Sequence, residues 1–221
     1  MIEPVGPDLR AGPLDASATS PAGWLVGAAF QRAATCFLVA DWWIATALHA
    51  VDDAEEAADR VVVFNFLQGG DPSTRDAYAL APENGYIPLD GADVALVRLR
   101  ERPGAVPPGR SWGRVALASA RTPALGEPVC TVCHWLREGS HVKSFSRGTV
   151  RGVDDLSIVY DAAANKGASG APVFSDDGAW LGIHLGEREG HSRAGQASVI
   201  VTALSAMPLA LDLRHALEES P

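Results

Sequence analysis

The stretch NKGASGAPVFSDDGAWLGIHLG, residues 165–186, places a serine in a glycine-rich turn directly before an apolar run. Gly167 and Gly170 lie on either side of Ser169, and glycine is the residue that tight turns use where the backbone needs unusual angles. The segments PVF and AWLGIHL are strand-like runs separated by a turn, and His184 lies in the second. A hydroxyl held in this way is either an ordinary turn residue or a nucleophile, and only the rest of the chain decides between the two.

Short apolar runs dominate the rest of the chain and predict a fold of many strands. They cover residues 23–30, 34–40, 42–48, 60–67, 93–100, 127–136, 141–153, 156–161, 170–174, 179–186 and 197–204. Runs of this length between glycine and proline turns are typical of β-barrels or of a β-sandwich. Residues 49–60 predict one early helix, and the apolar spacing after Pro208 predicts a C-terminal helix.

A segment rich in proline and glycine, residues 101–113, divides these runs into two similar halves. Such segments often connect structural units. We therefore expect a leader at 1–22, a first β unit at 23–112, a second β unit at 113–203 and a C-terminal helix at 204–221.

Composition narrows the class of function. The 221 residues carry a formal net charge of −9, and an acidic surface repels phosphate backbones, so we expect no nucleic-acid partner. Residues 1–20 lack the basic and apolar parts of a secretory signal. The most apolar stretch, residues 36–51, contains Asp41 and is shorter than the about 20 apolar residues that span a bilayer. We expect a cytoplasmic protein that does not enter a membrane.

Three cysteines, Cys36, Cys130 and Cys133, are an odd number and do not predict a disulfide framework. The segment CTVCH also resembles a haem attachment motif or half of a zinc site. Zinc needs about four ligands, and a second ligand pair is missing. Positions three apart on a strand point to opposite faces, so we expect one of Cys130 and Cys133 to face into a barrel and the other outward. We expect no metal and no other cofactor.

Two further motifs supply the partners that a serine nucleophile needs. His49 ends the apolar run IATAL, and Asp93 opens the run VALVRL. A serine hydroxyl is a weak nucleophile until a base removes its proton, and the base needs a carboxylate to hold its tautomer. Alone, the histidine would more often be a buried or rim histidine, and the aspartate could be a strand-start cap. Together, His49, Asp93 and Ser169 are candidate catalytic residues, with the backbone N–H groups of Gly167 and Ser169 as a candidate oxyanion hole.

These motifs resemble those of chymotrypsin-like serine proteases. The segments TCFLVADWWIATALHAV (residues 35–51), DVALVRL (93–99) and 165–186 carry the resemblance, which extends over about residues 24–205. The nearest branch is that of the glutamyl endopeptidases (V8-like) and related bacterial trypsin-like peptidases. The resemblance implies an all-β fold of two six-stranded antiparallel barrels with the active site between them. It also implies that Ser169 is the nucleophile, His49 the general base and then acid, and Asp93 the orienting carboxylate.

The resemblance also suggests a specificity pocket. Ala163 stands six residues before Ser169, where trypsin-like members that cleave after Lys or Arg have an aspartate. The segment GIHLG is similar to a strand of the glutamyl endopeptidases whose histidine contacts an acidic substrate side chain. We therefore expect His184 to donate a hydrogen bond to Glu or Gln. Ala164 replaces a hydroxyl residue of those enzymes, so a small or apolar substrate residue stays open. Lys166 supplies charge at the pocket rim or is simply solvated.

The sequence thus predicts a serine endopeptidase that acts on protein or peptide substrates through an acyl-enzyme. We expect such an enzyme to be restrained by a regulatory sensor module or partner protein. Two alternatives share the same residues: a protease-like binding module without activity, and an esterase.

Overall fold

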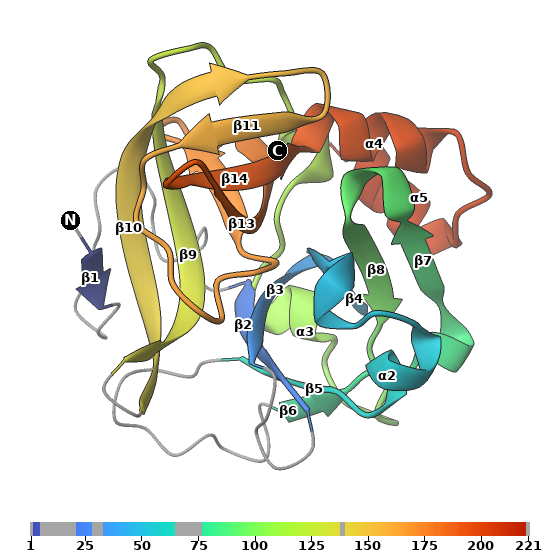
Figure 1. Cartoon of the computed structure of the whole chain (residues 1–221). Coiled ribbons are helices and arrows are strands. Elements are labelled where there is room, and N and C mark those ends of the chain that lie inside the picture. Colours follow the sequence, from blue (N-terminus) through green and yellow to red (C-terminus); the bar gives the residue numbers. More distant parts are fainter. Residues whose placement is uncertain (1, 5–20, 28–32, 65–76, 138–139, 220–221) are drawn as a thin grey trace.

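Two antiparallel β-sheets make up most of the protein, and the chain passes from the first sheet to the second once (Figure 1). A computed structural model describes residues 2–4, 21–27, 33–64, 77–137 and 140–219. Of the predicted leader, residues 1 and 5–20 lie outside this part, while Ile2–Pro4 form a short strand, β1, paired with the second sheet.

The first sheet is an open half-barrel. Its strand order is β6-β5-β2-β3-β4-β8-β7, all antiparallel. An isolated bridge between Leu80 and Leu99 brings the end of β6 beside the end of β8 and curls the sheet. The strands are β2 (Ala22–Val26), β3 (Ala34–Ala40), β4 (Trp43–Ala47), β5 (Val61–Val63), β6 (Ala77–Ala79), β7 (Tyr86–Leu89) and β8 (Val94–Arg98).

The second sheet closes into a six-stranded barrel, because β9 pairs with both β10 and β12, and β1 adds to the outside of β10. The predicted all-β class of chymotrypsin type is confirmed, with the difference that the first sheet stays open along its β6 and β7 edges. The strands are β9 (Pro128–Arg137), β10 (Ser140–Val153), β11 (Ser157–Tyr160), β12 (Pro172–Ser175), β13 (Trp180–Arg188) and β14 (His191–Gln196).

Helices lie at the ends of strands and at the C-terminal end. They are α2 (Ala54–Ala58), α3 (Pro108–Ser111), α4 (Ala197–Ser205) and α5 (Leu211–Glu218), with 3-10 turns η2 (Leu48–Ala50), η3 (Pro82–Asn84), η4 (Asp90–Ala92) and η5 (Leu117–Ser119). The predicted helix after Pro208 is α5. The strand predicted at 197–204 is wrong, since these residues form α4. The helix buries Ala197, Ile200 and Leu204, which are spaced three and four apart.

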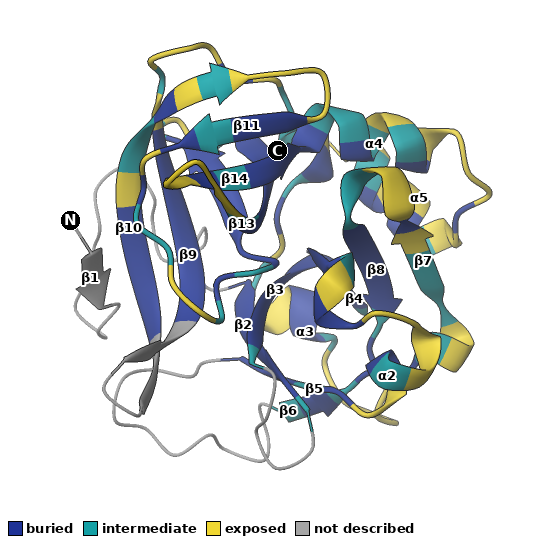
Figure 2. Cartoon of the chain, viewed as in Figure 1, coloured by how far each residue is buried: buried dark blue, intermediate teal, exposed yellow. Residues whose placement is uncertain are grey.

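One continuous core joins the two sheets. It contains Phe37 and Leu38 of β3 together with Trp180 and Ile183 of β13. The Phe37 and Trp180 rings meet edge to face with centroids 5.7 Å apart. Figure 2 shows the buried residues running along the strands where the sheets face each other. The sheets therefore form one packed unit, which fixes the relative positions of side chains that project from each.

The helix α5 packs back onto the first sheet. The indole Nε1–H of Trp43 on β4 donates to the carboxylate of Asp212, at 3.3 and 3.2 Å to its two oxygens. The guanidinium of Arg98 on β8 lies 3.5 Å from the same carboxylate and over the Trp43 ring. The C-terminal helix α5 thus contacts the first sheet, although the two are far apart in the sequence.

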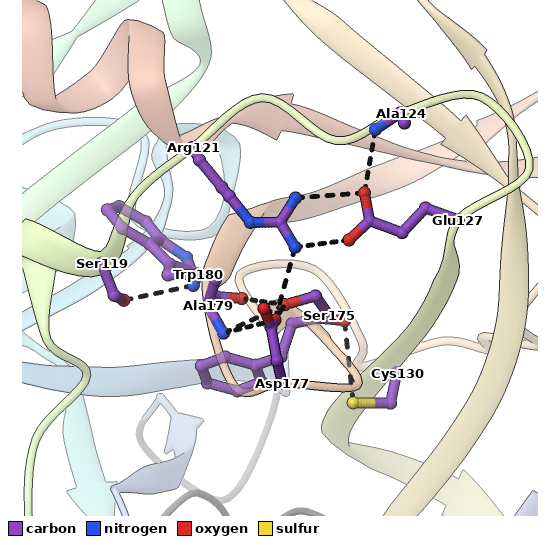
Figure 3. Close-up of polar contacts among 10 residues, drawn as sticks. Ser119, Arg121, Ala124, Glu127, Cys130, Ser175, Asp177, Ala179 and Trp180 are labelled. Carbon is purple, nitrogen blue, oxygen red and sulfur yellow. Dashed lines mark hydrogen bonds and ion pairs between the residues drawn. The ribbon is translucent and has the colours of Figure 1, made fainter.

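A polar cluster fixes the segment between the sheets against the β12–β13 hairpin (Figure 3). The Arg121 guanidinium pairs with Glu127 at 2.5 and 3.0 Å and reaches Asp177 in the hairpin at 3.3 Å. The Ser119 hydroxyl accepts from the Trp180 backbone N–H at 3.2 Å. This cluster holds the start of β13, the strand that carries His184.

Within the described residues, no helix is long and apolar enough to cross a membrane.

Candidate active site

Strand register brings His49 and Asp93 together. β4 and β8 are antiparallel neighbours, and Ala47 at the end of β4 pairs with Val94 at the start of β8. The residues just beyond these strand ends therefore lie side by side. The His49 Nδ1 lies 2.8 Å from Asp93 Oδ2, and the His49 backbone N–H donates to Asp93 Oδ1 at 3.1 Å. The carboxylate of Asp93 is thus hydrogen-bonded to both the ring and the backbone of His49.

Asp93 lies in the left-handed region of the backbone map, with φ of +54°. Aspartate is among the few residues that adopt this conformation readily. Burial acts to raise the pKa of Asp93, but hydrogen bonds from the His49 ring and backbone outweigh it, so the pKa of Asp93 is lowered. Asp93 is therefore an anion at neutral pH, able to hold the proton of His49 on Nδ1.

Ser169 lies in the second of two consecutive tight turns. The Ala168 N–H donates to Asn165 at 2.9 Å, and the Ala171 N–H donates to Ala168 at 2.9 Å. The third residue of each turn is a glycine with positive φ, +98° at Gly167 and +86° at Gly170. This combination is typical of type II turns. Ser169 is the second residue of its turn, which leaves its side chain at the turn's corner.

The first sheet anchors this turn through Thr35 at the start of β3. The Thr35 N–H donates to the Ser169 carbonyl at 2.8 Å, and the Thr35 hydroxyl donates to the Gly167 carbonyl at 2.7 Å. The same hydroxyl accepts the His134 N–H at 2.8 Å. Thr35 is completely buried. Sequence reasoning missed this residue, because it lies 132 positions from Gly167 and no local pattern marks it.

The result is a line of hydrogen bonds from carboxylate to imidazole to hydroxyl. The Ser169 Oγ lies 3.0 Å from His49 Nε2, on the opposite side of the ring from Asp93. The hydrogen bond to Asp93 raises the pKa of His49, although burial acts in the opposite direction. With its proton held on Nδ1, the neutral ring presents an unprotonated Nε2 that accepts the hydroxyl proton. The structure brings together the three residues that the sequence predicted.

The backbone beside Ser169 offers donors of the kind an oxyanion hole needs. In the described part of the chain, the N–H groups of Gly167 and Ser169 make no hydrogen bond, whereas the Ala168 and Gly170 N–H groups do. Gly170 donates to the His184 carbonyl at 2.8 Å. Among the described residues, the two N–H groups that make no hydrogen bond, those of Gly167 and Ser169, therefore lie beside the Ser169 hydroxyl.

His184 lies on β13 with its ring almost completely buried. Its Nδ1 is 2.7 Å from the Tyr160 hydroxyl at the end of β11. Burial keeps the pKa of Tyr160 well above its usual value, so the hydroxyl stays protonated. Burial lowers the pKa of His184 to about 4, so its ring is neutral at physiological pH. The Tyr160 hydroxyl has no other hydrogen-bond partner among the described residues, so it donates to Nδ1 and leaves the His184 proton on Nε2. Sequence reasoning missed Tyr160.

The remaining predicted pocket residues lie in the segment between β11 and the turn. Ala163 and Ala164 are half-buried, and Ala164 packs against Cys133, Ala168 and Ala171. Lys166 is exposed. Its ammonium makes no ion pair or hydrogen bond to the residues that the structure describes. The structure thus brings no predicted pocket residue other than His184 into a polar contact that would select a substrate.

The cysteines are buried and free. Cys130 and Cys133 face opposite sides of β9, as their spacing predicted: Cys133 lies on the inward face that carries Val129 of the barrel core, and Cys130 faces out of the barrel but is covered by the core between the sheets. Burial raises the pKa of both thiols to about 12, so neither is a thiolate. In the described ranges, no group of three or more His, Cys, Asp and Glu side chains is placed to hold a metal ion.

The sequence matches the model of a known protein family. The family model for the trypsin-like peptidase domain matches residues 34–183, and the chain belongs to that family. None of the curated proteins matches the sequence.

Solved structures agree on the fold. A Glu endopeptidase in complex with MPD is similar to this chain with a TM-score of 0.71 at 13% identity, covering 93% of this chain and 97% of that one. A serine endoprotease from Yersinia pestis gives a TM-score of 0.63 at 16% identity, covering 92% and 66%. The MamO protease domain from Magnetospirillum magneticum gives 0.63 at 16%, covering 85% and 97%. At these identities the likeness concerns the fold alone.

Proposed function

We propose that the protein is a serine endopeptidase in which Ser169 is the nucleophile, His49 the general base and then acid, and Asp93 the orienting carboxylate. The observation that carries the proposal is the hydrogen-bonded line through these three side chains, with both distances at or below 3.0 Å. Membership of the trypsin-like peptidase family supports peptide bonds as the target.

The chemistry follows from this line. His49 Nε2 takes the proton of Ser169 as Oγ attacks the substrate carbonyl carbon, and Asp93 stabilises the imidazolium that forms. The carbonyl oxygen becomes an oxyanion that accepts from the N–H groups of Gly167 and Ser169. His49 then gives its proton to the leaving amine, and water repeats the sequence on the acyl-enzyme. A missing donor at an oxyanion costs about 3–4 kcal/mol of transition-state stabilisation in a comparable enzyme.

We propose that the enzyme prefers Glu or Gln as the acyl residue, the residue whose carbonyl carbon is attacked. His184 is supported in this role by its place on β13, whose backbone is bonded to the turn of Ser169 through Gly170. A neutral Nε2–H donor serves an amide oxygen and a carboxylate oxygen alike. A small or apolar acyl residue is the competing preference. A cytoplasmic location and control by a sensor module or partner protein remain proposals that rest on the sequence.

Covalent labelling tests the assignment. A fluorophosphonate probe phosphonylates a serine that an adjacent base activates, and we expect it to label the wild type and leave Ser169→Ala unlabelled. Ser175→Ala is a matched control, since that hydroxyl is buried away from His49 and bonded to Asp177. Wild-type protein that never labels would identify the chain as a binding module without activity. Labelled protein that hydrolyses simple esters but no peptide in a proteome-derived library would be an esterase.

A further inference from the structure

Arg193 is a cation beside the candidate active site to which the mechanism gives no role. It lies on β14 and is half-buried. Across the part of the chain that the structure describes, its guanidinium makes no ion pair and no hydrogen bond. A charge that is partly removed from water loses hydration, and an acidic partner would compensate for that loss. Among the described residues, Arg193 is thus a cation beside the candidate site that has no acidic partner.

The alternation of β14 shows which way Arg193 points. Successive strand residues face opposite sides. Ala194 packs in the barrel core and the Ser192 hydroxyl donates to the Ala162 carbonyl, so these two face inward. Arg193 and Gly195 face the other side. A Cβ placed on Gly195 would lie 3.2 Å from the carbonyl oxygen of Ala92, the residue before Asp93. The face of β14 that carries Arg193 is thus turned toward the first sheet and the line of His49 and Asp93.

Electrostatics agrees with this direction. The positive charge of Arg193 acts to lower the pKa of His49, Asp93 and His184. Asp93 is nevertheless not its partner, since the Asp93 carboxylate is taken by His49 and no ion pair joins it to Arg193. Asp52 is the other charged group that acts on His49, and it acts in the opposite direction. Arg193 therefore adds a positive charge close to the reacting groups.

Space is available beside Arg193. Its register partner on β13 is Gly186, which has no side chain to cover it. A Cβ placed on Gly186 would meet nothing within 4 Å. β12 pairs with β13 only as far as Ile183, so in the described structure the edge of β13 beyond His184 has β14 as its single neighbour. The edge opposite β14 is open and begins at the residue bonded to the nucleophile turn.

An open strand edge binds extended peptides by backbone hydrogen bonds. A substrate with its acyl residue at His184 that pairs antiparallel with β13 would run backward along Leu185–Glu187. The residues N-terminal to the acyl residue would then lie over Gly186, within reach of a long side chain from the neighbouring strand. Guanidinium groups bind carboxylates through paired hydrogen bonds.

We propose that Arg193 binds an acidic side chain of the substrate, located one to three residues N-terminal to the acyl residue. This inference rests on the proposed peptidase activity and adds a second specificity position outside the pocket of His184.

Matched peptides test it. Each peptide keeps the same acyl residue and carries Glu, Gln or Lys at one of the three upstream positions, and kcat/KM is measured for each. We expect the wild type to prefer Glu over Gln at one position by about tenfold, mostly through KM. Arg193→Met should lose this preference, Arg193→Lys should keep part of it, and Arg193→Glu should favour Lys. Arg188→Met, on the same hairpin and exposed, should behave as the wild type.

The outcomes separate the two proposals. Fluorophosphonate labelling of every variant shows that it is folded and that Ser169 is active. A wild type without an upstream acidic preference overturns the role of Arg193. An Arg193→Met variant that slows all peptides equally overturns it too, because Arg193 would then act on His49 and Asp93 rather than on the substrate. Wild-type protein that never labels instead removes the peptidase proposal on which this inference rests.

Discussion

The backbone N–H of Thr35 donates to the carbonyl oxygen of Ser169 at 2.8 Å, so the turn of the candidate nucleophile is bonded to the opposite sheet. The Thr35 hydroxyl makes a second bond across the same boundary, to Gly167. The distance between His49 and Ser169 therefore depends on direct bonds as well as on the packing of the core.

Removing the Thr35 hydroxyl should loosen this turn. Thr35→Val keeps the shape but removes the hydroxyl's bonds to the Gly167 carbonyl and the His134 N–H, and losing such a bond at a buried group costs about 1–3 kcal/mol. We expect a lower free energy of unfolding in urea. We also expect a lower kcat, because the N–H groups of Gly167 and Ser169 are no longer held in position to bind the oxyanion. Thr35→Ser keeps the hydroxyl and should restore kcat. Equal kcat for Val and Ser variants would contradict this account.

Gly170 should tolerate no side chain. Its φ of +86° favours glycine, and an added Cβ would lie 2.1 Å from the Thr35 carbonyl oxygen. Gly170→Ala should therefore unfold at clearly lower temperature and lose activity. Gly190→Ala separates the two causes, since Gly190 has φ of +79° but open space around it. That control should cost only the backbone strain of about 1 kcal/mol. A Gly170→Ala melting temperature equal to that of the control would rule out the clash.

Asp93→Asn should keep the fold and lose most of the activity. The amide cannot stabilise the imidazolium and favours the wrong tautomer of His49, and the equivalent change lowers kcat about 10⁴-fold in a comparable enzyme. Single-turnover acylation by a reactive ester measures the effect on Ser169 directly. Asp90→Asn, three residues earlier in η4, is a matched control that should acylate at the wild-type rate. A loss of less than about tenfold would contradict the role of Asp93.

The pH profile of kcat/KM should report the raised pKa of His49. The base acts when neutral, so activity is lost as pH falls through its pKa. Asp93 raises that pKa above its usual value of about 6.5, so the acidic limb should lie above it. In Asp93→Asn the limb of the residual activity should move to lower pH. For stability the sign is reversed: the paired, protonated His49 stabilises the fold at low pH, and this contribution is lost as pH rises through its raised pKa. An acidic limb below about 6 in the wild type would contradict the pairing.

The Tyr160 hydroxyl should act on specificity through His184. Tyr160→Phe removes the bond that keeps the His184 proton on Nε2, so cleavage after Glu and Gln should weaken mainly through KM. His184→Ala should lower cleavage after Glu or Gln much more than after Leu. Both variants should keep the wild-type rate of labelling by the fluorophosphonate. Equal losses for Glu, Gln and Leu substrates would remove His184 from the pocket.

Local sequence patterns identified the three candidate catalytic residues, whereas residues whose roles follow only from the pairing of neighbouring strands were not identified. His49, Asp93 and Ser169 each follow or precede an apolar run or sit in a glycine turn, so local patterns point to them. Tyr160 and Arg193 matter because β11, β14 and β13 pair in one register, which no local pattern encodes.

Errors in the predicted elements have the same origin. The β-branched residues of 197–204 favour a strand by propensity. The structure makes them a helix because Ala197, Ile200 and Leu204 fit one buried face against the second sheet and η5. The sequence also did not predict that the first sheet is open, because closure of a barrel depends on pairing between distant segments.

Each end of the described chain is bonded to the sheet that lies farther from it in the sequence. β1 precedes the first sheet in sequence but is hydrogen-bonded to the barrel, and α5 follows the barrel but holds Trp43 of the first sheet through Asp212. Each sheet therefore depends on a contact that the other half of the chain supplies. The molecule should melt in a single cooperative transition, and separate expression of the halves would yield two insoluble fragments rather than two small domains.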